Sequence, residues 1–443
     1  MFELEKAKLP EKLAPEWHRF YAGKIEIIPK CAIRGLDDFS VWYTPGVAEP
    51  CREIAEDPDK VYEYTSKWNT IAIVSDGSRT LGLGNIGPHA ALPVMEGKAL
   101  LFKYLGAVDA FPVMIDTQDP DKIIETVKLI SPSFGGINLE DLSTPKCFYI
   151  LERLQNELDI PVWHDDQLGT ATASLAGLYN ALKIVGKRLS EVKIAIIGAG
   201  AANIATVRLL KAAGADTRNM FVVDSRGILH KGRKDLEAKK KDNPYKWQLC
   251  LETNAEGRTG GIKDALKGVD VVIAASKPGP GVIKKEWIEE MNDDAIVFAE
   301  ANPVPEIWPW EAKEAGARIV GTGRSDFPNQ INNSLVFPAV FRGVLTVRAR
   351  KITDEMCVTA AKTIAEFAER RGIHEEYIIP KMTECEVYPE VATAVAVKAM
   401  EQGVARIEMS EEEIYENARD MIVSTQKKIK MLQEVGFISP PPE

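Results

Sequence analysis

Val192-Lys193-Ile194-Ala195-Ile196-Ile197-Gly198-Ala199-Gly200-Ala201-Ala202-Asn203 is the stretch of this 443-residue sequence that decides its fold. Apolar residues run into two glycines and then into a segment that favours a helix, so the pattern predicts a strand, a tight turn and a helix over 204–213. A second apolar run, 220–223, ends in Asp224. This order is typical of a βαβ unit that binds a dinucleotide, with the pyrophosphate at the N-terminus of the helix.

Two details differ from the common dinucleotide fingerprint. Asn203 stands where a third glycine would let helix and strand pack closely, and Asp224 lies 26 residues after Gly198, instead of about 20. A βαβ turn with a purely structural role is the alternative. Because the flanking elements are in the right order, we expect dinucleotide binding, with contacts from Gly198, Ala199, Gly200, Ala201 and Ala202.

The second half of the chain continues this alternation of strands and helices. Further strands are predicted over 269–275, 295–299 and 317–320. In a doubly wound sheet the ends of such strands face the ligand, so Ser276 and Asn302 are candidate contacts to cofactor or substrate. Asn332 and Asn333 follow in another polar loop, although asparagine is an ordinary turn residue in most proteins. Amphipathic helices are predicted from 350 onward.

The first half of the chain is also predicted to be α/β. Strands are expected over 69–75, 109–116, up to 139 and over 161–163, and helices over 95–105, 120–130, 145–158 and 171–185. A short alternating run, 25–29, suggests a strand or an extended arm. We therefore expect an N-terminal α/β substrate and metal domain over 1–167, a Rossmann-like, doubly wound NAD(P)-binding domain over 168–390 and a helical C-terminal tail over 391–443.

A second glycine-rich stretch follows the strand predicted over 69–75. Gly82, Gly84 and Gly87 have the spacing of a dinucleotide fingerprint, but Pro88 directly after the third glycine fits poorly with a helix that packs on the strand. We expect a loop that lets the backbone approach a ligand closely. Arg79 is then available for a carboxylate or phosphate, and a solvated surface arginine is the alternative.

Lys98 lies on the apolar face of the helix predicted over 95–105. Leu101, Phe102 and Leu105 share this face through spacings of three, four and seven residues. A lone lysine in this position commonly extends its amine to water. The alternative is a buried amine with a lowered pKa that acts as a base.

Three carboxylates follow strand ends in the first half of the chain. Glu140 and Asp141 come after one strand region and Asp166 after the next, with Asp165 beside it. Neighbouring strand ends would bring them together, and carboxylates without His or Cys partners suit Mg²⁺ or Mn²⁺ better than zinc. Acidic pairs are otherwise solvated surface. Thr170 follows in a segment that enters a helix, whose N-terminus would face the ligand.

Two aromatic or basic residues near these motifs are less informative. Tyr43 lies on irregular backbone, because Pro45 disfavours helical geometry before it and a helix begins near Val47. It is either a buried anchor of this turn or a functional group. His164 is tempting as a metal ligand, but we assign it to packing or orientation.

Composition excludes several classes of protein. The formal net charge of −10 argues against broad nucleic-acid binding. The six cysteines form no C-x-x-C pair, which is typical of reduced thiols. The first residues lack the basic and apolar regions of a secretory signal, and no apolar run approaches the roughly 20 residues of a membrane span. We expect a cytoplasmic protein without a membrane partner.

Taken together, the motifs resemble those of malic enzymes of the short prokaryotic type. The matching pieces occur in family order across roughly residues 20–400. They are Tyr43-Thr44-Pro45-Gly46-Val47, Leu81-Gly82-Leu83-Gly84-Asn85-Ile86-Gly87, Glu96-Gly97-Lys98-Ala99, Asn138-Leu139-Glu140-Asp141, His164-Asp165-Asp166-Gln167, Gly198-Ala199-Gly200-Ala201-Ala202, Ala301-Asn302-Pro303 and Asn332-Asn333-Ser334.

The resemblance implies oxidative decarboxylation of L-malate to pyruvate and CO₂ with NAD or NADP and a divalent metal, Mg²⁺ or Mn²⁺. It assigns Lys98 as the base for the C2 hydroxyl proton and Tyr43 as the acid that protonates C3. Glu140, Asp141 and Asp166 hold the metal, and Asp165 tunes Lys98. Arg79, Asn302, Asn332 and Asn333 orient the substrate and the nicotinamide. The resemblance also suggests homodimers or higher homo-oligomers, with Tyr43 reaching toward a neighbouring subunit.

The choice between NAD and NADP stays open at this point. Asp224, Ser225 and Arg226 follow the second strand and are expected at the adenosine ribose. The aspartate suits the 2′-hydroxyl of NAD, whereas Arg226 and the lysine run 239–241 suit a 2′-phosphate. Thr170 is a further expected cofactor contact.

Three other functions are compatible with parts of the pattern. A metal-dependent oxaloacetate decarboxylase would use the same carboxylates and Tyr43. A non-catalytic nucleotide-sensing module would need only the Gly198 turn. A hydroxy- or amino-acid dehydrogenase without decarboxylation would leave the metal carboxylates unexplained.

Overall fold

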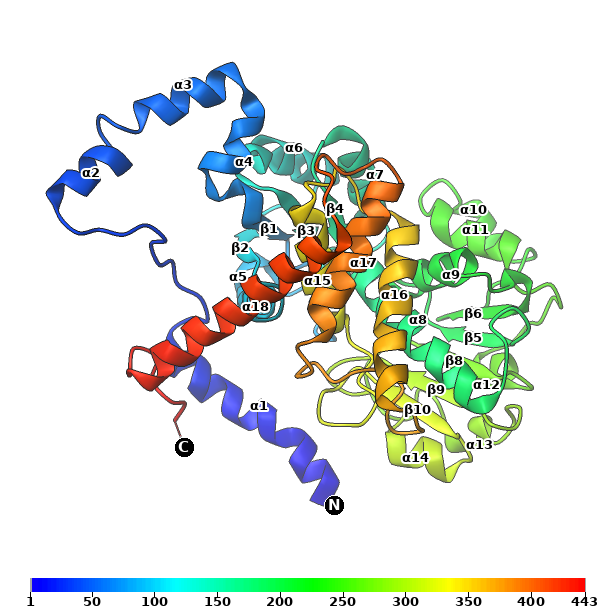
Figure 1. Cartoon of the computed structure of the whole chain (residues 1–443). Coiled ribbons are helices and arrows are strands. Elements are labelled where there is room, and N and C mark those ends of the chain that lie inside the picture. Colours follow the sequence, from blue (N-terminus) through cyan, green and yellow to red (C-terminus); the bar gives the residue numbers. More distant parts are fainter. Residues whose placement is uncertain (1, 443) are drawn as a thin grey trace.

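A computed structural model describes residues 2–442 and contains one parallel and one mainly parallel sheet, each covered by helices (Figure 1). The predicted α/β class, with a Rossmann-like second unit and a helical C-terminal region, is confirmed. No helix among the described residues is both long and apolar enough to cross a membrane.

The first sheet has the strand order β2-β1-β3-β4, and all of its strands are parallel. The strands are β1 (Thr70–Ser75), β2 (Asp109–Met114), β3 (Gly136–Leu139) and β4 (Val162–His164). The connecting helices are α5 (Gly87–Gly106), α6 (Pro120–Ile130) and α7 (Lys146–Glu157). Every residue of β1 is buried, as expected for a central parallel strand covered on both faces. The carboxyl ends of β3 and β4 therefore lie side by side.

The second sheet has the order β10-β9-β8-β5-β6-β7. Its strands are β5 (Ile194–Ile197), β6 (Met220–Asp224), β7 (Gly227–Ile228), β8 (Val271–Ala274), β9 (Ile296–Ala299) and β10 (Ile319–Thr322). Only the short edge strand β7 is antiparallel, and the sequence did not predict it. The helix α9 (Ala201–Ala212) follows β5 directly through the glycine turn. The smaller helices of this unit are α10 (Lys234–Ala238), α11 (Pro244–Glu252), α12 (Ile262–Leu266), α13 (Lys285–Ile288) and α14 (Pro309–Glu314).

Helix α8 (Asp165–Val185) joins the two sheets and begins earlier than the sequence predicted. Its first turn contains Asp165 and Asp166, which favour a helix N-terminus because they complement the helix dipole. The apolar periodicity that predicted a start at 171 covers only the later turns. The predicted boundary at 167/168 falls inside this helix, and the domain division stays a prediction.

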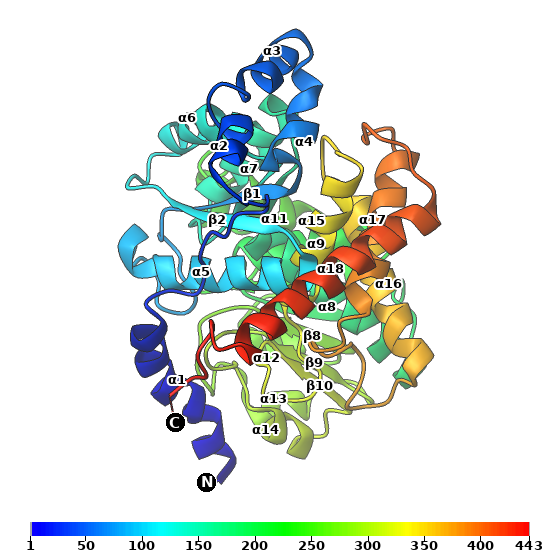
Figure 2. The ribbon, with the colours of Figure 1, turned by 60° about the vertical axis from the view of Figure 1, so that its left-hand side comes forward.

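The C-terminal helices pack back onto the body of the protein. They are α15 (Phe337–Thr346), α16 (Asp354–Arg371), α17 (Val387–Glu401) and α18 (Glu411–Glu434). Helix α18 lies across α5 of the first unit, where Gln426 Nε2 donates to the carbonyl of Tyr104 at 3.1 Å (Figure 2). The predicted boundary at 390/391 falls inside α17.

The N-terminal arm, residues 25–57, projects from the body (Figure 1). It follows α1 (Phe2–Tyr21) and carries α2 (Leu36–Trp42) and α3 (Ala48–Glu56), before α4 (Val61–Tyr64) leads into the first sheet. Residues 25–29 are extended and form no strand. Neither α2 nor α3 has a buried residue. Isolated helices of this length are marginal in water, so the arm lacks part of its packing within one chain.

Candidate active site

A cleft of about 320 Å³ lies where the carboxyl ends of strands from both sheets meet. Most of the sequence-predicted site residues line it: Arg79, Lys98, Glu140, Asp141, Asp166, Thr170, Gly200, Ala201, Ala202, Ser276, Asn302, Asn332 and Asn333. The lining also includes Leu81, from the loop with the Gly82 spacing. One cleft thus combines acidic groups, a lysine and a glycine turn.

Glu140, Asp141 and Asp166 lie close enough to hold one metal ion. One carboxylate oxygen from each falls within 4.8 Å of the others. Asp141 Oδ2 is buried and has no hydrogen-bond partner among the described residues. Burial, followed by the charge of Asp166, raises the pKa of Asp141 to about 8, and burial raises that of Glu140 well above its ordinary value. Bringing three carboxylates together is unfavourable without a cation, so the donor set fits a hard divalent ion.

Lys98 is buried between two of the predicted site carboxylates. Its Nζ lies 2.8 Å from Glu140 Oε1 and in direct contact with Asp165 Oδ2. The ammonium also lies 4.4 Å from the centre of the Phe337 ring. The predicted burial of the amine is therefore confirmed, and the alternative of an amine that extends to water is wrong.

The electrostatic consequence of this burial differs from the prediction. Burial lowers the pKa of Lys98, but the charges of Asp165 and Glu140 outweigh it and raise this pKa above its ordinary value. Burial therefore does not depress the pKa of Lys98 by itself, because the amine also contacts two carboxylates. The predicted depression relied on a neighbouring metal ion as well, and positive charge at the carboxylates would act against the upward shift.

Asp165 lies behind Lys98 and does not line the cleft. It is fully buried, and its Oδ1 accepts a hydrogen bond of 2.9 Å from Trp163 Nε1. A Cβ at Gly169 would collide with this carboxylate, so the glycine leaves room for it one turn along α8. Burial raises the pKa of Asp165. The contacts of Asp165 suit a residue that positions the lysine.

His164 is buried at the end of β4, and neither ring nitrogen has a hydrogen-bond partner among the described residues. Its Nε2 lies 3.4 Å from Asp166 Oδ2. Burial lowers the pKa of the imidazole, which favours the neutral ring. His164 is not part of the three-carboxylate cluster, and its role in packing or orientation stays a prediction.

The glycine turn between β5 and α9 has the geometry of a phosphate-binding turn. Gly198 has a φ of +108°, and a Cβ there would lie 2.6 Å from the carbonyl oxygen of Ala275. A Cβ at Gly200 would meet no atom within 4 Å, so this backbone is open to a ligand. The first N–H groups of α9 have no side-chain cap at Gly200. These donors, with the dipole of the helix, fit a pyrophosphate.

Asn203 stands at the position of the third glycine, and its side chain stabilises the turn through hydrogen bonds. Its Nδ2 donates to the carbonyl of Ile197 at 2.8 Å and to that of Gly198 at 3.1 Å, and the residue is buried. The side chain thus ties the first turn of α9 to the end of β5. This contact explains how the departure from the glycine fingerprint is accommodated.

Asp224 is already engaged by two cations. Arg233 Nη1 lies 3.1 Å from Asp224 Oδ1, and Lys246 Nζ lies 2.7 Å from its Oδ2. Ser225 and Arg226 are exposed in the turn between β6 and β7. With Gly198 and Ala199, these three predicted cofactor residues lie outside the lining of the 320 Å³ cleft. Sequence reasoning missed Arg233 and Lys246.

Two buried glutamates of this region were also missed. Glu306 accepts hydrogen bonds from Ser276 N at 2.7 Å, from Ser276 Oγ at 2.9 Å and from Ala301 N at 3.1 Å, which ties the loops of Ser276 and Asn302 together. Glu300 lines the cleft and contacts Ser174 of α8. An acidic residue directly after the buried strand predicted over 295–299 was the available signal for Glu300.

The structure does not bring Tyr43 to the cleft of its own chain. Tyr43 lies on the N-terminal arm after α2, is 73% exposed and does not line the cavity. The alternative of a buried anchor is wrong for the same reason.

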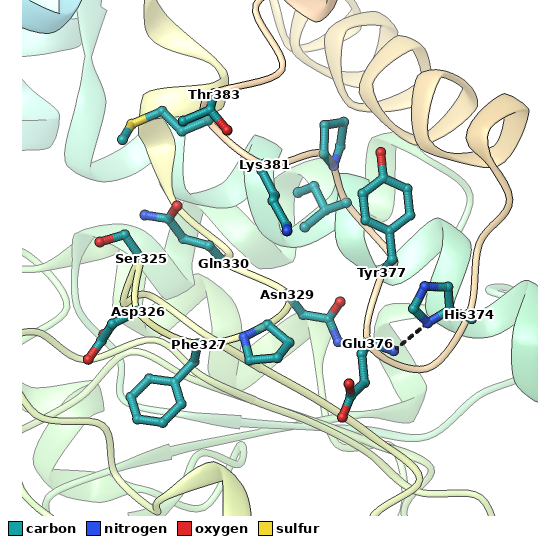
Figure 3. Close-up of a pocket in the computed structure, with 14 residues that line it drawn as sticks. Ser325, Asp326, Phe327, Asn329, Gln330, His374, Glu376, Tyr377, Lys381 and Thr383 are labelled. Carbon is teal, nitrogen blue, oxygen red and sulfur yellow. Dashed lines mark hydrogen bonds between the residues drawn. The ribbon is translucent and has the colours of Figure 1, made fainter. Parts of the chain in front are cut away.

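A larger hollow of about 540 Å³ lies between the 325–330 loop and the 374–383 segment (Figure 3). Its acidic residues are already paired, Asp326 with Arg324 and Glu376 with Lys313. Asn329 joins the two walls, since its Oδ1 accepts from the backbone N–H of Ile378 at 3.0 Å. The hollow contains no metal-ligand cluster and no helix N-terminus with a glycine turn, so size alone does not identify the site.

Comparisons with known proteins agree with this geometry. Residues 22–155 match the family model described as malic enzyme, N-terminal domain, and residues 168–404 match the one described as malic enzyme, NAD binding domain. The bifunctional malic/malolactic enzyme of Bacillus subtilis is 50% identical over 406 residues, which are 92% of this chain and 97% of that protein. The NAD-dependent malic enzyme of Geobacillus stearothermophilus is 51% identical over 384 residues, or 87% of this chain and 78% of that protein.

The solved structures that resemble this chain include malic enzymes. The malic enzyme of Pyrococcus horikoshii matches with a TM-score of 0.88 and 58% identity, covering 93% of this chain and 94% of that one. The malic enzyme of Entamoeba histolytica matches with a TM-score of 0.96 and 47% identity, covering 99% and 91%.

Proposed function

The chain belongs to the malic enzyme family, and from this premise we propose how its own residues carry out the reaction. The protein oxidatively decarboxylates malate: L-malate and NAD(P)⁺ give pyruvate, CO₂ and NAD(P)H. The observation that carries the assignment of roles is the buried Lys98 held by Asp165 and Glu140, next to the carboxylate cluster and in the same cleft as the glycine turn.

Lys98 is the base in this proposal. Its Nζ takes the proton from the C2 hydroxyl as the C2–H bond breaks. Asp165 positions the amine through direct contact, and Glu140 contacts the lysine as well as belonging to the metal cluster. The metal ligands are Glu140, Asp141 and Asp166. A cation held by these ligands would neutralise Glu140, which is one of the two carboxylates that raise the pKa of Lys98, and would thereby lower this pKa.

A bound metal ion and a nicotinamide cofactor would supply the remaining chemistry. A divalent cation, Mg²⁺ or Mn²⁺, supplies the positive charge that polarises the C2 oxygen and favours loss of CO₂. The nicotinamide ring supplies the two-electron oxidant. Arg79, Asn302, Asn332 and Asn333 surround the remaining space and bind and orient the substrate carboxylates and the ring. Thr170 completes this wall of the cleft.

The protein accepts NAD or NADP, and the cluster around Asp224 decides the preference. A free aspartate at this position would repel a 2′-phosphate. Here Arg233 and Lys246 compensate its charge, and the exposed Arg226 lies beside it with its Nη1 3.4 Å from Asp235 Oδ2. Both cofactors are therefore compatible with the ribose site, with the 2′-hydroxyl of NAD bound by Asp224.

Tyr43 is the acid that protonates C3 of the enol product, and it acts from a second copy of the chain. The N-terminal arm presents Ile27, Leu36, Val41, Trp42 and Tyr43, all more than half exposed. An apolar surface of this kind marks an interface, and the short helices α2 and α3 need packing from another molecule. A homodimer that exchanges arms covers this surface and completes each cleft with a tyrosine.

Mixing two inactive variants tests the shared site. In a homodimer with exchanged arms, a Tyr43→Phe subunit and a Lys98→Ala subunit together form one site that lacks both groups and one site that is complete. Co-refolding or co-expressing the two variants is expected to restore about a quarter of the wild-type activity, because half of the dimers are mixed and each mixed dimer has one complete site.

The control is each variant mixed with itself, which restores nothing. If Tyr43 acted within its own chain, every site of the mixed dimer would lack one group, and an inactive mixture that contains mixed dimers would contradict the proposal. Sedimentation of the wild-type protein measures the oligomeric state independently.

Oxidation of malate is tested by the absorbance of the reduced nicotinamide at about 340 nm. Malate with Mn²⁺ is expected to give an increase with NAD and with NADP, and pyruvate is measured in parallel. An oxaloacetate decarboxylase without hydride transfer would give no absorbance change but would release CO₂ from oxaloacetate. A nucleotide-sensing module would give no absorbance change and would release no CO₂ from oxaloacetate. A dehydrogenase without decarboxylation would give no pyruvate.

A further inference from the structure

Glu300 is a buried carboxyl group in the cleft to which the reaction steps above assign no role. It directly follows β9, where its backbone N–H donates to the carbonyl of Ala274 at 2.8 Å, and it is 7% exposed. Its Oε2 is buried and has no hydrogen-bond partner among the described residues. A buried, unpaired carboxyl oxygen in the lining of a ligand cleft is costly unless a ligand group pairs with it.

The contacts of Glu300 engage only one of its two carboxyl oxygens. Ser174 Oγ donates to Glu300 Oε1 at 2.7 Å and to the carbonyl oxygen of Thr170 at 2.9 Å, so one hydroxyl proton is shared by two acceptors. Oε2 of Glu300 is therefore left to pair with a ligand group.

The surroundings of Glu300 favour its neutral, protonated form. Burial raises the pKa of Glu300 to about 8, because the hydrogen bond from Ser174 lowers this pKa by less and the charge of Glu306 on the following loop raises it further. The other groups that line this part of the cleft are neutral: Thr170 and Ser174 from α8, Ser276 after β8, and Asn332 and Asn333 from the polar loop. No described cation pairs with Glu300.

The order of the strands places Glu300 at one end of a bound dinucleotide. The glycine turn follows β5, Asp224 follows β6 on one side of it, and Glu300 follows β9 beyond β8 on the other side. A dinucleotide with its pyrophosphate on α9 and its adenosine ribose near Asp224 extends its other half toward β9. Asn302 and Lys98 line the same cavity as Glu300, so that half is the nicotinamide.

We propose that Glu300 contacts the nicotinamide half of the cofactor and releases its proton when the oxidised cofactor binds, so that it distinguishes NAD(P)⁺ from NAD(P)H. This inference rests on the proposed use of a nicotinamide cofactor. The oxidised ring carries a positive charge and the reduced ring does not. A positive ring beside a buried carboxyl stabilises the carboxylate, whereas the neutral reduced ring leaves the carboxyl protonated and able to donate a hydrogen bond to the carboxamide oxygen.

The proposal predicts proton release on binding, measured with the whole protein by calorimetry in two buffers of different ionisation enthalpy. Near pH 7, NAD⁺ is expected to release most of one proton from the wild-type protein, and NADH almost none. The affinity for NAD⁺ should rise up to about tenfold for each pH unit between 7 and 8, while the affinity for NADH stays flat. In the Glu300→Gln variant, proton release and this pH dependence should both disappear.

Asp116→Asn is the matched control. It removes an exposed carboxyl group that follows β2 and does not line the cleft. Its proton release on NAD⁺ binding should equal that of the wild type. NADH binding by Glu300→Gln, followed by the fluorescence of the reduced ring, shows that the variant is folded.

The outcomes separate this inference from the proposed function. Binding of NAD⁺ without proton release in the wild type, or with undiminished release in Glu300→Gln, would overturn the role of Glu300 and leave the malic enzyme activity standing. Failure of the wild type to bind either NAD(H) or NADP(H) would overturn both.

Discussion

Lys98→Ala is expected to lower kcat for malate oxidation by about 10³-fold while leaving the affinity for NAD(P) within about twofold of the wild type. The amine is a buried basic group in contact with two site carboxylates, and the substitution removes the proposed acceptor of the C2 hydroxyl proton. The proposed contacts to the pyrophosphate and ribose come from the turn between β5 and α9 and from the end of β6, and Lys98 belongs to α5. Steady-state kinetics and fluorescence titration with NADH measure the two quantities.

Two further variants test whether the loss of activity is due to the loss of a base at position 98. Lys98→Arg keeps a positive charge but cannot lose a proton near neutrality, so it should be nearly as inactive as Lys98→Ala. Lys103→Ala removes a half-exposed lysine from the same helix, where it pairs with Asp109, and should remain active. Malate turnover near the wild-type rate in Lys98→Ala would remove Lys98 from the mechanism. Thermal unfolding checks that Asp165 and Glu140, left without their partner, do not unfold the protein.

Asp166→Asn is expected to lower the affinity for Mn²⁺ at least about tenfold and the turnover at least about 100-fold. The substitution preserves shape but removes one of the three carboxylate charges that converge within 4.8 Å. It also leaves the backbone N–H of Asp141 with a weaker acceptor, since this N–H donates to Asp166 Oδ2 at 2.8 Å. Calorimetry with Mn²⁺ alone measures the affinity, independently of activity.

The matched control is Asp116→Asn, an exposed aspartate just after β2 in the same sheet, which should bind Mn²⁺ and turn over malate normally. Treating the wild type with a chelator should abolish pyruvate formation, and added Mn²⁺ should restore it. An Asp166→Asn variant with unchanged Mn²⁺ affinity would place the metal elsewhere.

The order of the elements could be predicted because it depends on local patterns. The buried strand β1 and the exact bounds of α6 follow from runs of apolar residues and from a proline at the helix start. The start of α8 could not be predicted in this way. Its first turn owes its helical geometry to acidic residues at a helix N-terminus, where apolar periodicity carries no signal. The two-residue strand β7 is too short to have a pattern.

The sequence predicted which types of residue follow the strand ends and form the candidate site. Parallel strands bring their carboxyl ends to one edge, which is why Glu140, Asp141 and Asp166 converge as expected. The ion pairs between side chains on different helices and strands could not be predicted. Nothing in the segment 95–105 shows that Lys98 contacts Glu140 as well as Asp165, or that Arg233 and Lys246 engage Asp224.

The sequence by itself determined the two α/β units, the glycine turn and the kinds of groups in the cleft, because apolar periodicity and turn chemistry are properties of neighbouring residues. Only the tertiary structure decided which charges meet. Lys98 and Asp165 are 67 residues apart, and Ser174 and Glu300 are 126 apart. Electrostatic interaction depends on distance in space and on burial, so the raised pKa values of Lys98 and Glu300 follow from the fold. The position of Tyr43 outside its own cleft is likewise a property of the folded arm.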